Sequence, residues 1–230
     1  AAFTAVDAAE TPEGRESAWR TNACGVAHLA RAADEHDVPP VQFSSEYVFD
    51  GRWLGPIPET APLSPLSAYG ASKAAGDVVA GLARRHYLIR TTWVTGHGNN
   101  FVRTMLGLAR RGVRPTVVAD QIGRLTFADD LASAAVDLLL AGAPHGTYNI
   151  TGGGDAGSWA DVARAVFALA GHSPADVSDT TTAAYFAGRP TAAARPLNSV
   201  LALGRAESIG LHPPDWRDRL EDYVKRGLSD

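Results

Sequence analysis

The chain has 230 residues, a net charge of −4, 45% hydrophobic and 20% charged residues, and one cysteine, Cys24. The small, mixed charge argues against nucleic-acid binding, which needs a basic stripe. No apolar run reaches the roughly 18 residues of a membrane span. One cysteine excludes an intramolecular disulfide and fits a reducing compartment. We therefore expect a cytoplasmic protein with no nucleic-acid or membrane partner, in which Cys24 is a small buried helix residue.

Helical and strand patterns alternate through the first two-thirds of the chain. Trp19, Asn22 and Val26 recur at helical spacing, residues 41–44 read as a short buried strand, and residues 52–67 carry four prolines and read as a long loop. In chain order, the expected elements are a helix over 16–34, a strand over 41–44, a helix over 68–85, a strand over 87–92, a helix over 101–111, a strand over 116–118, a helix over 129–141, a strand over 147–150, and helices over 158–170 and 215–225. The alternation predicts an α/β fold with parallel strands joined by helical crossovers.

Two of the expected helices carry N-terminal signals. Asp129 has the side chain of an N-cap residue, and Ser158 with Asp161 three residues later forms a variant of the capping box. The final third of the chain is more irregular and is expected to form a smaller substrate-binding lobe. We expect an approximate division into residues 1–150 and 151–230, with interleaved segments.

The strand that ends at Ser44 and Ser45 carries the first candidate chemistry. In open α/β sheets, ligands bind beyond the carboxyl ends of the strands. Tyr69 and Lys73 are four residues apart, so they share one face of the following helix. If that helix packs beside the strand, Ser45, Tyr69 and Lys73 converge.

That trio suits proton exchange with a carbonyl or alkoxide oxygen. The pKa of a free tyrosine is about 10, and a nearby lysine ammonium lowers it. Lowering it to about 7 takes roughly 4 kcal/mol. The serine hydroxyl supplies a second hydrogen bond to the same oxygen. The trio favours hydride transfer to a carbonyl carbon, although a Tyr-x-x-x-Lys spacing alone also arises by chance on amphipathic helices.

Six blocks of sequence occur in the order and spacing of a known family: SSEYVFDG, PLSAYGASKAAGD, IRTTWVTGHGNNFVRTML, ADQIGRLTFADDLA, ARPLNSVL and WRDRL. Together they resemble the dTDP-4-dehydrorhamnose reductase family of extended short-chain dehydrogenases/reductases, over essentially the whole chain. The resemblance implies a Rossmann-like parallel sheet. It also implies reduction of the 4-keto group of a dTDP-4-dehydro-6-deoxysugar, of the type found in dTDP-L-rhamnose biosynthesis, with NADPH as cofactor and NADH as the alternative.

The resemblance assigns roles to individual residues. Ser45 stands where the family usually has a catalytic threonine, Tyr69 would donate the proton, and Lys73 would bind the nicotinamide ribose and lower the tyrosine pKa. The other assigned residues are Ala1, Ala2 and Thr4 along the cofactor, and Val6, Tyr47, Trp93, Asn100 and Arg195 along the substrate.

Three of the substrate residues have a structural alternative. Trp93 follows a strand, where a tryptophan is commonly a core residue, and Asn100 has the side chain of a helix cap. Arg195 is either a ligand of the diphosphate, because a guanidinium binds it bidentately, or a surface arginine. In addition, Glu46 replaces the family's usual aspartate, and Asn22 stands where relatives support the active-site lysine through water.

The family begins with a strand and a glycine-rich turn, G-x-x-G-x-x-G, that holds the cofactor phosphates, and the chain contains no match to it. We therefore expect that roughly the first sixty residues of the family are missing, that NADPH binds weakly to a chain beginning at Ala1, and that a sheet edge is left unpaired.

The resemblance also allows Mg²⁺ and a homodimer, although no acidic residues can be assigned to a metal site. Two alternatives for the function stay open. One is a reductase of an antibiotic deoxysugar pathway. The other is a non-catalytic regulatory subunit resembling that of methionine adenosyltransferase, which the intact Ser45, Tyr69 and Lys73 disfavour and the missing glycine turn favours.

Overall fold

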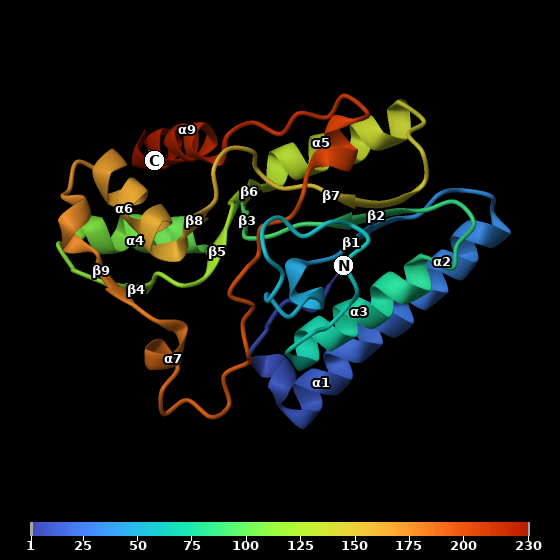
Figure 1. The fold of residues 1–230 in the computed structure, drawn as a ribbon, viewed down its shortest axis with the longest axis horizontal. Helices are drawn as coiled ribbons and strands as arrows, with labels where there is room; N and C mark the ends of the chain where they lie inside the picture. Colours follow the sequence, from blue (N-terminus) through green and yellow to red (C-terminus); the bar gives the residue numbers. More distant parts are fainter. Residues whose placement is uncertain (1, 230) are drawn as a thin grey trace.

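A computed structural model describes residues 2–229. Its central sheet has three parallel strands in the order β1 (Val41–Phe43), β2 (Tyr87–Arg90) and β7 (Gly146–Asn149) (Figure 1). Each connection between neighbouring strands contains a helix, which is what parallel pairing requires. The predicted α/β fold with parallel strands is therefore confirmed, and β1 and β7 each begin or end within a residue of the predicted strand.

Helices cover both faces of this sheet. The helices α2 (Gly25–Glu35) and α3 (Ala68–Ala80) lie on one face, and α5 (Ala128–Leu140) lies on the other (Figure 1). Successive side chains of β2 point to opposite faces. Leu88 accordingly packs in a cluster with residues of α2 and α3, and Ile89 packs in a second cluster with residues of α5. Burying such a side chain contributes roughly 2 kcal/mol.

The N-terminal helical segment is longer than predicted and contains a π-helical turn. It runs through α1 (Pro12–Trp19), the π-helical turn η2 (Arg20–Cys24) and α2 without a break. The helix begins earlier because Thr11 caps it, accepting a hydrogen bond from the Gly14 backbone nitrogen. The prediction that Cys24 is buried is wrong: its neighbours Asn22 and Ala23 face the interior, and Cys24 is exposed.

Helix α3 packs very close to two other segments. Ser67 caps it by accepting a hydrogen bond from the Gly70 nitrogen. A Cβ atom at Gly70 would collide with the carbonyl oxygen of Tyr47, and one at Gly76 would collide with the carbonyl oxygen of Asn22. Glycine at these two positions therefore lets α3 approach both the short helix η3 (Glu46–Val48) and the π-helical turn. The helix ends at Ala80, earlier than the predicted limit of residue 85.

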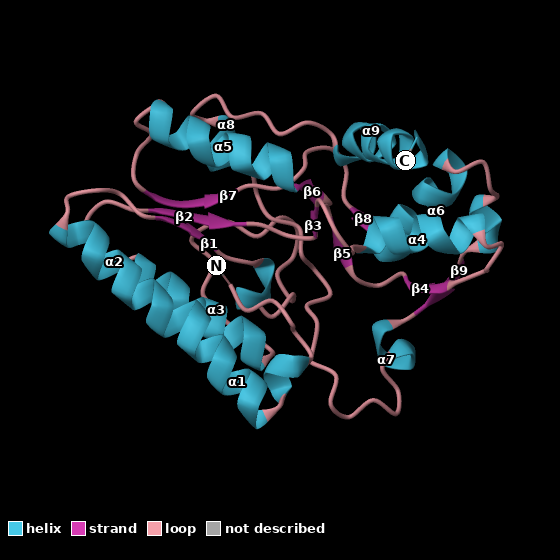
Figure 2. Ribbon diagram, turned by 180° about the vertical axis from the view of Figure 1, so that it is seen from behind, coloured by secondary structure: helices cyan, strands magenta, loops and turns pink. Residues whose placement is uncertain are grey.

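A second lobe lies beyond the carboxyl ends of the strands (Figure 2). Three helices supply most of its core: α4 (Phe101–Arg110), α6 (Trp159–Leu169) and α9 (Trp216–Ser229). Phe167 and Trp216 are buried residues of these helices, and Leu125 joins the core from a connecting segment. The lobe thus combines segments from both sides of residue 150, so segments of the two expected parts of the chain are interleaved here.

Within residues 2–229, three short strand pairs lie apart from the central sheet. They are the parallel pairs β3 (Val94–Thr95) with β6 (Thr126–Phe127) and β4 (Thr116–Val118) with β9 (Ser178–Thr180), and the antiparallel pair β5 (Ile122–Gly123) with β8 (Gly157–Ser158). The remaining short helices are η1 (Ala8–Glu10), η3 (Glu46–Val48), η4 (Pro174–Asp176), α7 (Thr182–Tyr185) and α8 (Gly204–Glu207).

The two predicted helix caps have different outcomes. The capping box of α6 is confirmed, because Ser158 and Asp161 exchange the expected side-chain to backbone hydrogen bonds. The Asp129 cap is wrong: the N-cap position of α5 is Phe127, and Asp129 lies in the first turn. A carboxylate there still interacts favourably with the helix dipole. Over residues 2–229, none of the helices combines the length and apolar character needed to cross a bilayer.

Candidate active site

A cavity of about 460 Å³ lies between the sheet and the second lobe. Its wall includes Ser44 and Ser45, which follow β1, and Thr91 and Thr92, which follow β2. The cavity therefore opens at the carboxyl ends of parallel strands, where α/β proteins bind their ligands. The three residues predicted to be catalytic, Ser45, Tyr69 and Lys73, all line it.

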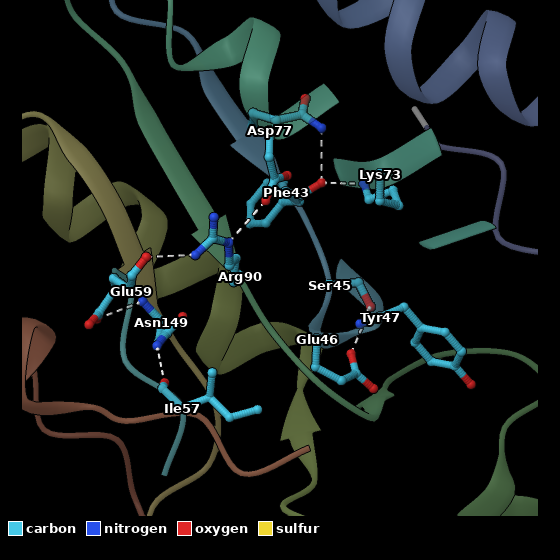
Figure 3. Close-up of polar contacts among 11 residues, drawn as sticks. Phe43, Ser45, Glu46, Tyr47, Ile57, Glu59, Lys73, Asp77, Arg90 and Asn149 are labelled. Atoms are coloured by element: carbon cyan, nitrogen blue, oxygen red, sulfur yellow. Dashed lines mark hydrogen bonds and ion pairs between the residues drawn. The ribbon is translucent and has the colours of Figure 1, made fainter. Parts of the chain in front are cut away.

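Ser45 is fixed in place by the turn that follows β1. It is the N-cap of η3, and its Oγ accepts a hydrogen bond from the Tyr47 nitrogen at 3.3 Å. The same hydroxyl donates to Oε2 of Glu46 at 2.7 Å (Figure 3). Since a hydroxyl has one proton to donate, the Ser45 proton is directed at the Glu46 carboxyl in this structure.

Glu46 brings a carboxyl with a strongly shifted pKa to the cavity wall. Only 3% of the residue is exposed, and burial raises the pKa of its carboxyl to about 7, against smaller opposing effects from Ser45 and Thr92. A carboxyl group whose pKa is shifted close to physiological pH is a common feature of functional sites. In the sequence, Glu46 was notable only because it replaces the aspartate that is usual in the family, and no role was assigned to it.

Tyr69 lies near the N-terminal end of α3, with its ring edge-on to that of Tyr47 at a centroid distance of 5.4 Å. Burial and, second, the Glu46 carboxyl raise the pKa of Tyr69 to about 12, while a hydrogen bond with the Ser45 side chain lowers it. The lowered pKa predicted from the sequence is therefore wrong for this structure. Tyr69 keeps its proton at neutral pH and is placed to donate it.

Lys73 lies one helical turn after Tyr69 and is 4% exposed. Its Nζ donates to the carbonyl oxygen of Phe43 at 2.5 Å (Figure 3). Burial lowers the pKa of Lys73, and the negative charge of Asp77 opposes that shift. Asp77 itself forms a buried ion pair with Arg90, with Oδ2 2.9 Å from Nε. An ammonium has three N–H donors, so the Lys73 ammonium retains donor capacity beyond its bond to Phe43.

The segment assigned to the cofactor lies on one side of the cavity. Ala1 lies outside the described residues, whereas Ala2 and Thr4 line the cavity. Asn22 anchors this segment: it accepts from the Phe3 nitrogen at 2.9 Å and donates to the Phe3 oxygen at 3.0 Å. Small side chains beside a buried ammonium fit the ribose and flat ring of a nicotinamide nucleotide, because the ammonium can donate to ribose hydroxyls.

Three of the five predicted substrate residues also line the cavity: Val6, Tyr47 and Trp93. Trp93 has a left-handed backbone, with φ of 49°, which is costly for a bulky residue and is concentrated at functional sites. Its ring stacks on Trp159 at 3.8 Å with an interplanar angle of 18°. A Cβ atom at Gly123 would lie 2.8 Å from the Trp93 ring, so glycine leaves room for the stack.

Asn100 is not among the residues that line this cavity, and the structure supports its alternative interpretation as a helix cap. Its Oδ1 accepts from the Arg103 nitrogen at 3.0 Å, at the start of α4. Its Nδ2 donates to the Gly96 oxygen at 2.9 Å and to the Tyr223 hydroxyl at 2.8 Å. With both ends of the amide engaged in the protein, the structure does not bring Asn100 to the site.

Arg195 lies next to the cavity but not in its wall. The guanidinium binds the Asp7 carboxylate bidentately, at 2.6 and 2.9 Å, and lies over the Phe186 ring at 4.8 Å. Pro196, its neighbour in the chain, does line the cavity. Arg195 is therefore paired with a carboxylate in this structure, and its role as a diphosphate ligand stays a prediction.

The cavity wall also contains residues that the sequence analysis did not assign. They include Glu46, Gln121, Trp159, Pro196 and Ser199. Gln121, Pro196 and Ser199 belong to blocks that carry the family resemblance, which was the available signal for them. Trp159 lies outside these blocks, and in the sequence it carries only the pattern of the helix expected over 158–170.

No group of three or more His, Cys, Asp or Glu side chains among residues 2–229 is placed to hold a metal ion. The Mg²⁺ expectation therefore finds no support in the part of the chain that the structure describes.

Comparison with known proteins gives a consistent result. Residues 1–229 match the family that is described as the RmlD substrate binding domain. A dTDP-4-dehydrorhamnose reductase of Aggregatibacter actinomycetemcomitans is 39% identical over 96% of this chain and 78% of its own length. A probable dTDP-4,6-dihydroxy-2-methyloxan-3-one 4-ketoreductase of Streptomyces antibioticus is 38% identical over 96% of this chain and 74% of its own length.

A solved structure is similar over nearly the whole chain. The crystal structure of dTDP-4-dehydrorhamnose reductase from Bacillus anthracis, in complex with NADP, superposes with a TM-score of 0.87. The two sequences are 32% identical, and the match covers 98% of this chain and 78% of that one.

Proposed function

This chain belongs to the dTDP-4-dehydrorhamnose reductase family, and from that premise we propose that it reduces the 4-keto group of a dTDP-4-dehydro-6-deoxysugar with NADPH. The observation that carries the proposal is the placement of Ser45, Tyr69 and Lys73 in the wall of one cavity. The single cysteine, which fits a reducing compartment, supports a cytoplasmic location as part of the same proposal.

The residues of the cavity have complementary roles in this reaction. NADPH, when bound beside Ala2, Thr4 and Lys73, supplies the hydride for C4 of the sugar. Tyr69 donates the proton to the oxygen of C4, for which its high pKa keeps it protonated. Ser45 gives the same oxygen a second hydrogen bond and fixes its position.

The remaining walls suit a deoxysugar nucleotide. The stacked rings of Trp93 and Trp159 form an apolar surface beside the catalytic side chains. Such a surface packs against the C–H groups of a sugar, and the apolar methyl group of a 6-deoxysugar adds to that contact. Tyr47 and Val6 add further apolar surface to the cavity wall.

The test is turnover of the purified protein with a dTDP-4-dehydro-6-deoxysugar, followed by the loss of NADPH absorbance. Tyr69→Phe should lower the rate by about 10²–10⁴-fold, the range of general acid catalysis, while the far-ultraviolet circular dichroism spectrum stays unchanged. Tyr185→Phe, at an exposed tyrosine outside the cavity, is the matched control. Full activity of Tyr69→Phe, or no turnover by the wild type, would contradict the proposal.

A second candidate function is the same 4-keto reduction with a different sugar nucleotide as substrate. The similarity to the Streptomyces antibioticus 4-ketoreductase, nearly as high as that to the rhamnose enzyme, favours a substrate of an antibiotic deoxysugar pathway. Comparing kcat/KM for the two keto sugars decides between them. A non-catalytic regulatory role has no such observation in its favour.

A further inference from the structure

We propose that Glu46 acts as a positioning residue, whose protonation state decides whether the Ser45 hydroxyl donates to the substrate ketone or accepts from the product alcohol. The inference rests on the proposed function, since it concerns the oxygen at C4 that the reaction converts. It assigns a role to a side chain that shares the cavity wall with the catalytic residues.

The geometry leaves the Ser45 hydroxyl few choices. Its Oγ accepts from the Tyr47 nitrogen at 3.3 Å and donates to Glu46 Oε2 at 2.7 Å. A hydroxyl has one proton and two lone pairs. While Glu46 is an anion it takes that proton, because charge-assisted hydrogen bonds are stronger than neutral ones. Ser45 then has no proton for a ligand, and its second lone pair can accept only from a donor such as the Tyr69 hydroxyl or a ligand hydroxyl.

The two protonation states therefore recognise different ligands. A ketone oxygen only accepts hydrogen bonds, so it gains nothing from a Ser45 hydroxyl that also only accepts. An alcohol can donate, and it matches that state. When Glu46 is protonated, its own O–H can donate to Ser45 Oγ, which frees the Ser45 proton for the ketone.

The surroundings of Glu46 place this change near neutral pH. Burial raises its pKa to about 7. The titratable groups that share its cavity wall are Tyr47, Tyr69 and Lys73. Further out, Asp77 acts on Tyr69 and Lys73.

The remaining charged groups near this part of the cavity are Asp7 and Arg195. The ion pair of Asp7 and Arg195 acts on Tyr47 from that side. Burial also raises the pKa values of both tyrosines, to about 12 for Tyr69 and higher for Tyr47. Neither phenol therefore ionises over the pH range in which Glu46 changes state.

The kinetic test compares the wild type with Glu46→Gln in both directions of the reaction. For the wild type, kcat/KM of ketone reduction should be constant below about pH 7 and fall tenfold per pH unit above it, because the protonated form is the productive one. The reverse reaction should rise tenfold per pH unit up to about pH 7 and then level off. A glutamine amide always has an N–H to donate to Ser45, so reduction by Glu46→Gln should be constant from about pH 6 to 9.

A binding measurement supplies a readout without turnover. Titration of the protein with the sugar-nucleotide alcohol at about pH 6, in buffers of different ionisation enthalpy, should show proton release by the wild type, because the alcohol selects ionised Glu46. Ser45→Ala should abolish this release although Glu46 is still present. Glu59→Gln is the control, since Glu59 lies outside the cavity wall and accepts from the Asn149 nitrogen.

The outcomes separate this inference from the proposed function. If Glu46→Gln and the wild type have the same pH profile, or if the alcohol binds without proton release, the role of Glu46 is refuted. Should Glu46→Gln fail to fold, Ser45→Ala and the proton release of the wild type still decide the question. Absence of turnover at every pH, with proton release intact, would overturn the proposed reaction and leave the Glu46–Ser45 switch supported.

Discussion

Asn22 holds Phe3 through both ends of its side-chain amide, accepting from the Phe3 nitrogen at 2.9 Å and donating to the Phe3 oxygen at 3.0 Å. The same Nδ2 donates to Ser72 Oγ at 3.0 Å. A buried residue of the π-helical turn thus ties the segment that lines one side of the cavity to helix α3. Because Ser72 immediately precedes Lys73, this connection relates the expected cofactor segment to the catalytic helix.

Replacing Asn22 by Ala should therefore affect both stability and nucleotide binding. The change leaves the Phe3 backbone groups without their buried partner, at a cost of about 1–3 kcal/mol for each such group. We expect a lower urea midpoint, and an affinity for NADPH that falls more than kcat does. Asn99→Ala, at an exposed position, should change neither, and an unaltered midpoint for Asn22→Ala would contradict the anchoring role.

Gly76→Ala should destabilise the protein, although alanine favours helices. A Cβ atom at position 76 would collide with the carbonyl oxygen of Asn22, so α3 must move away from the π-helical turn, at a cost of about 1–3 kcal/mol typical of overpacking. Gly107→Ala, in the helix α4, meets only the Arg111 side chain at 3.6 Å. That control should stabilise the protein by about 0.5–1 kcal/mol. Equal effects of the two substitutions in denaturant unfolding would show that the close contact is unimportant.

Local patterns were sufficient to predict the parallel strands and the shared helix face of Tyr69 and Lys73. The alternation of strand and helix patterns reports the parallel sheet directly, and the i, i+4 spacing of Tyr69 and Lys73 places both on one face of α3. The capping box at Ser158 is also a local signal, and it was confirmed. The helix and strand patterns, the Tyr69–Lys73 spacing and the capping box are each read within a few residues of the chain, whereas the strand pairing follows from their alternation.

Features that depend on distant partners could not be predicted in the same way. Ile122 and Gly123 form a strand only because Gly157 and Ser158 pair with them from far along the chain. The guanidinium of Arg195 pairs with the carboxylate of Asp7, which lies 188 residues away in the sequence. The high pKa of Tyr69 follows from burial and, second, from the Glu46 carboxyl, and neither effect can be read from the spacing of Tyr69 and Lys73.

The buried pair of Asp77 and Arg90 should matter more than exposed pairs of similar geometry. Both side chains are almost fully buried, with Nε 2.9 Å from Oδ2. Asp77→Ala leaves an arginine charge without its partner in the interior, which typically costs 3–5 kcal/mol. Asp176→Ala breaks an equally short pair with Arg114, whose side chain is 79% exposed, and should cost at most about 1 kcal/mol. Similar losses in urea unfolding for both variants would contradict this distinction.

Trp159 should contribute to sugar binding through its stack with Trp93. Trp159→Ala removes the partner ring at 3.8 Å and leaves Trp93, with its left-handed backbone, without support. We expect KM for the sugar nucleotide to rise by about tenfold, the equivalent of a lost aromatic contact of roughly 1.4 kcal/mol. Trp19→Ala, at a tryptophan that is 42% exposed, is the control. An unchanged KM for Trp159→Ala would place the sugar elsewhere in the cavity.

Glu46 should make the stability of the protein depend on pH in a direction opposite to that of most carboxylates. Burial raises its pKa from 4.5 to about 7 in the folded state, so between these values the folded protein binds a proton that the unfolded chain releases. Stability therefore falls as the pH rises through this window, and the full penalty of roughly 3 kcal/mol is present above it.

Glu46→Gln removes this penalty while keeping a side chain of the same shape. The variant should be more stable than the wild type by up to about 3 kcal/mol at pH 8 and by less than about 1 kcal/mol at pH 5. Urea unfolding at both pH values measures the difference, and Glu59→Gln serves as the matched substitution outside the cavity. A gain that is the same at both pH values would mean that Glu46 titrates as an ordinary glutamate, and the pH-dependent orientation of Ser45 would lose its basis.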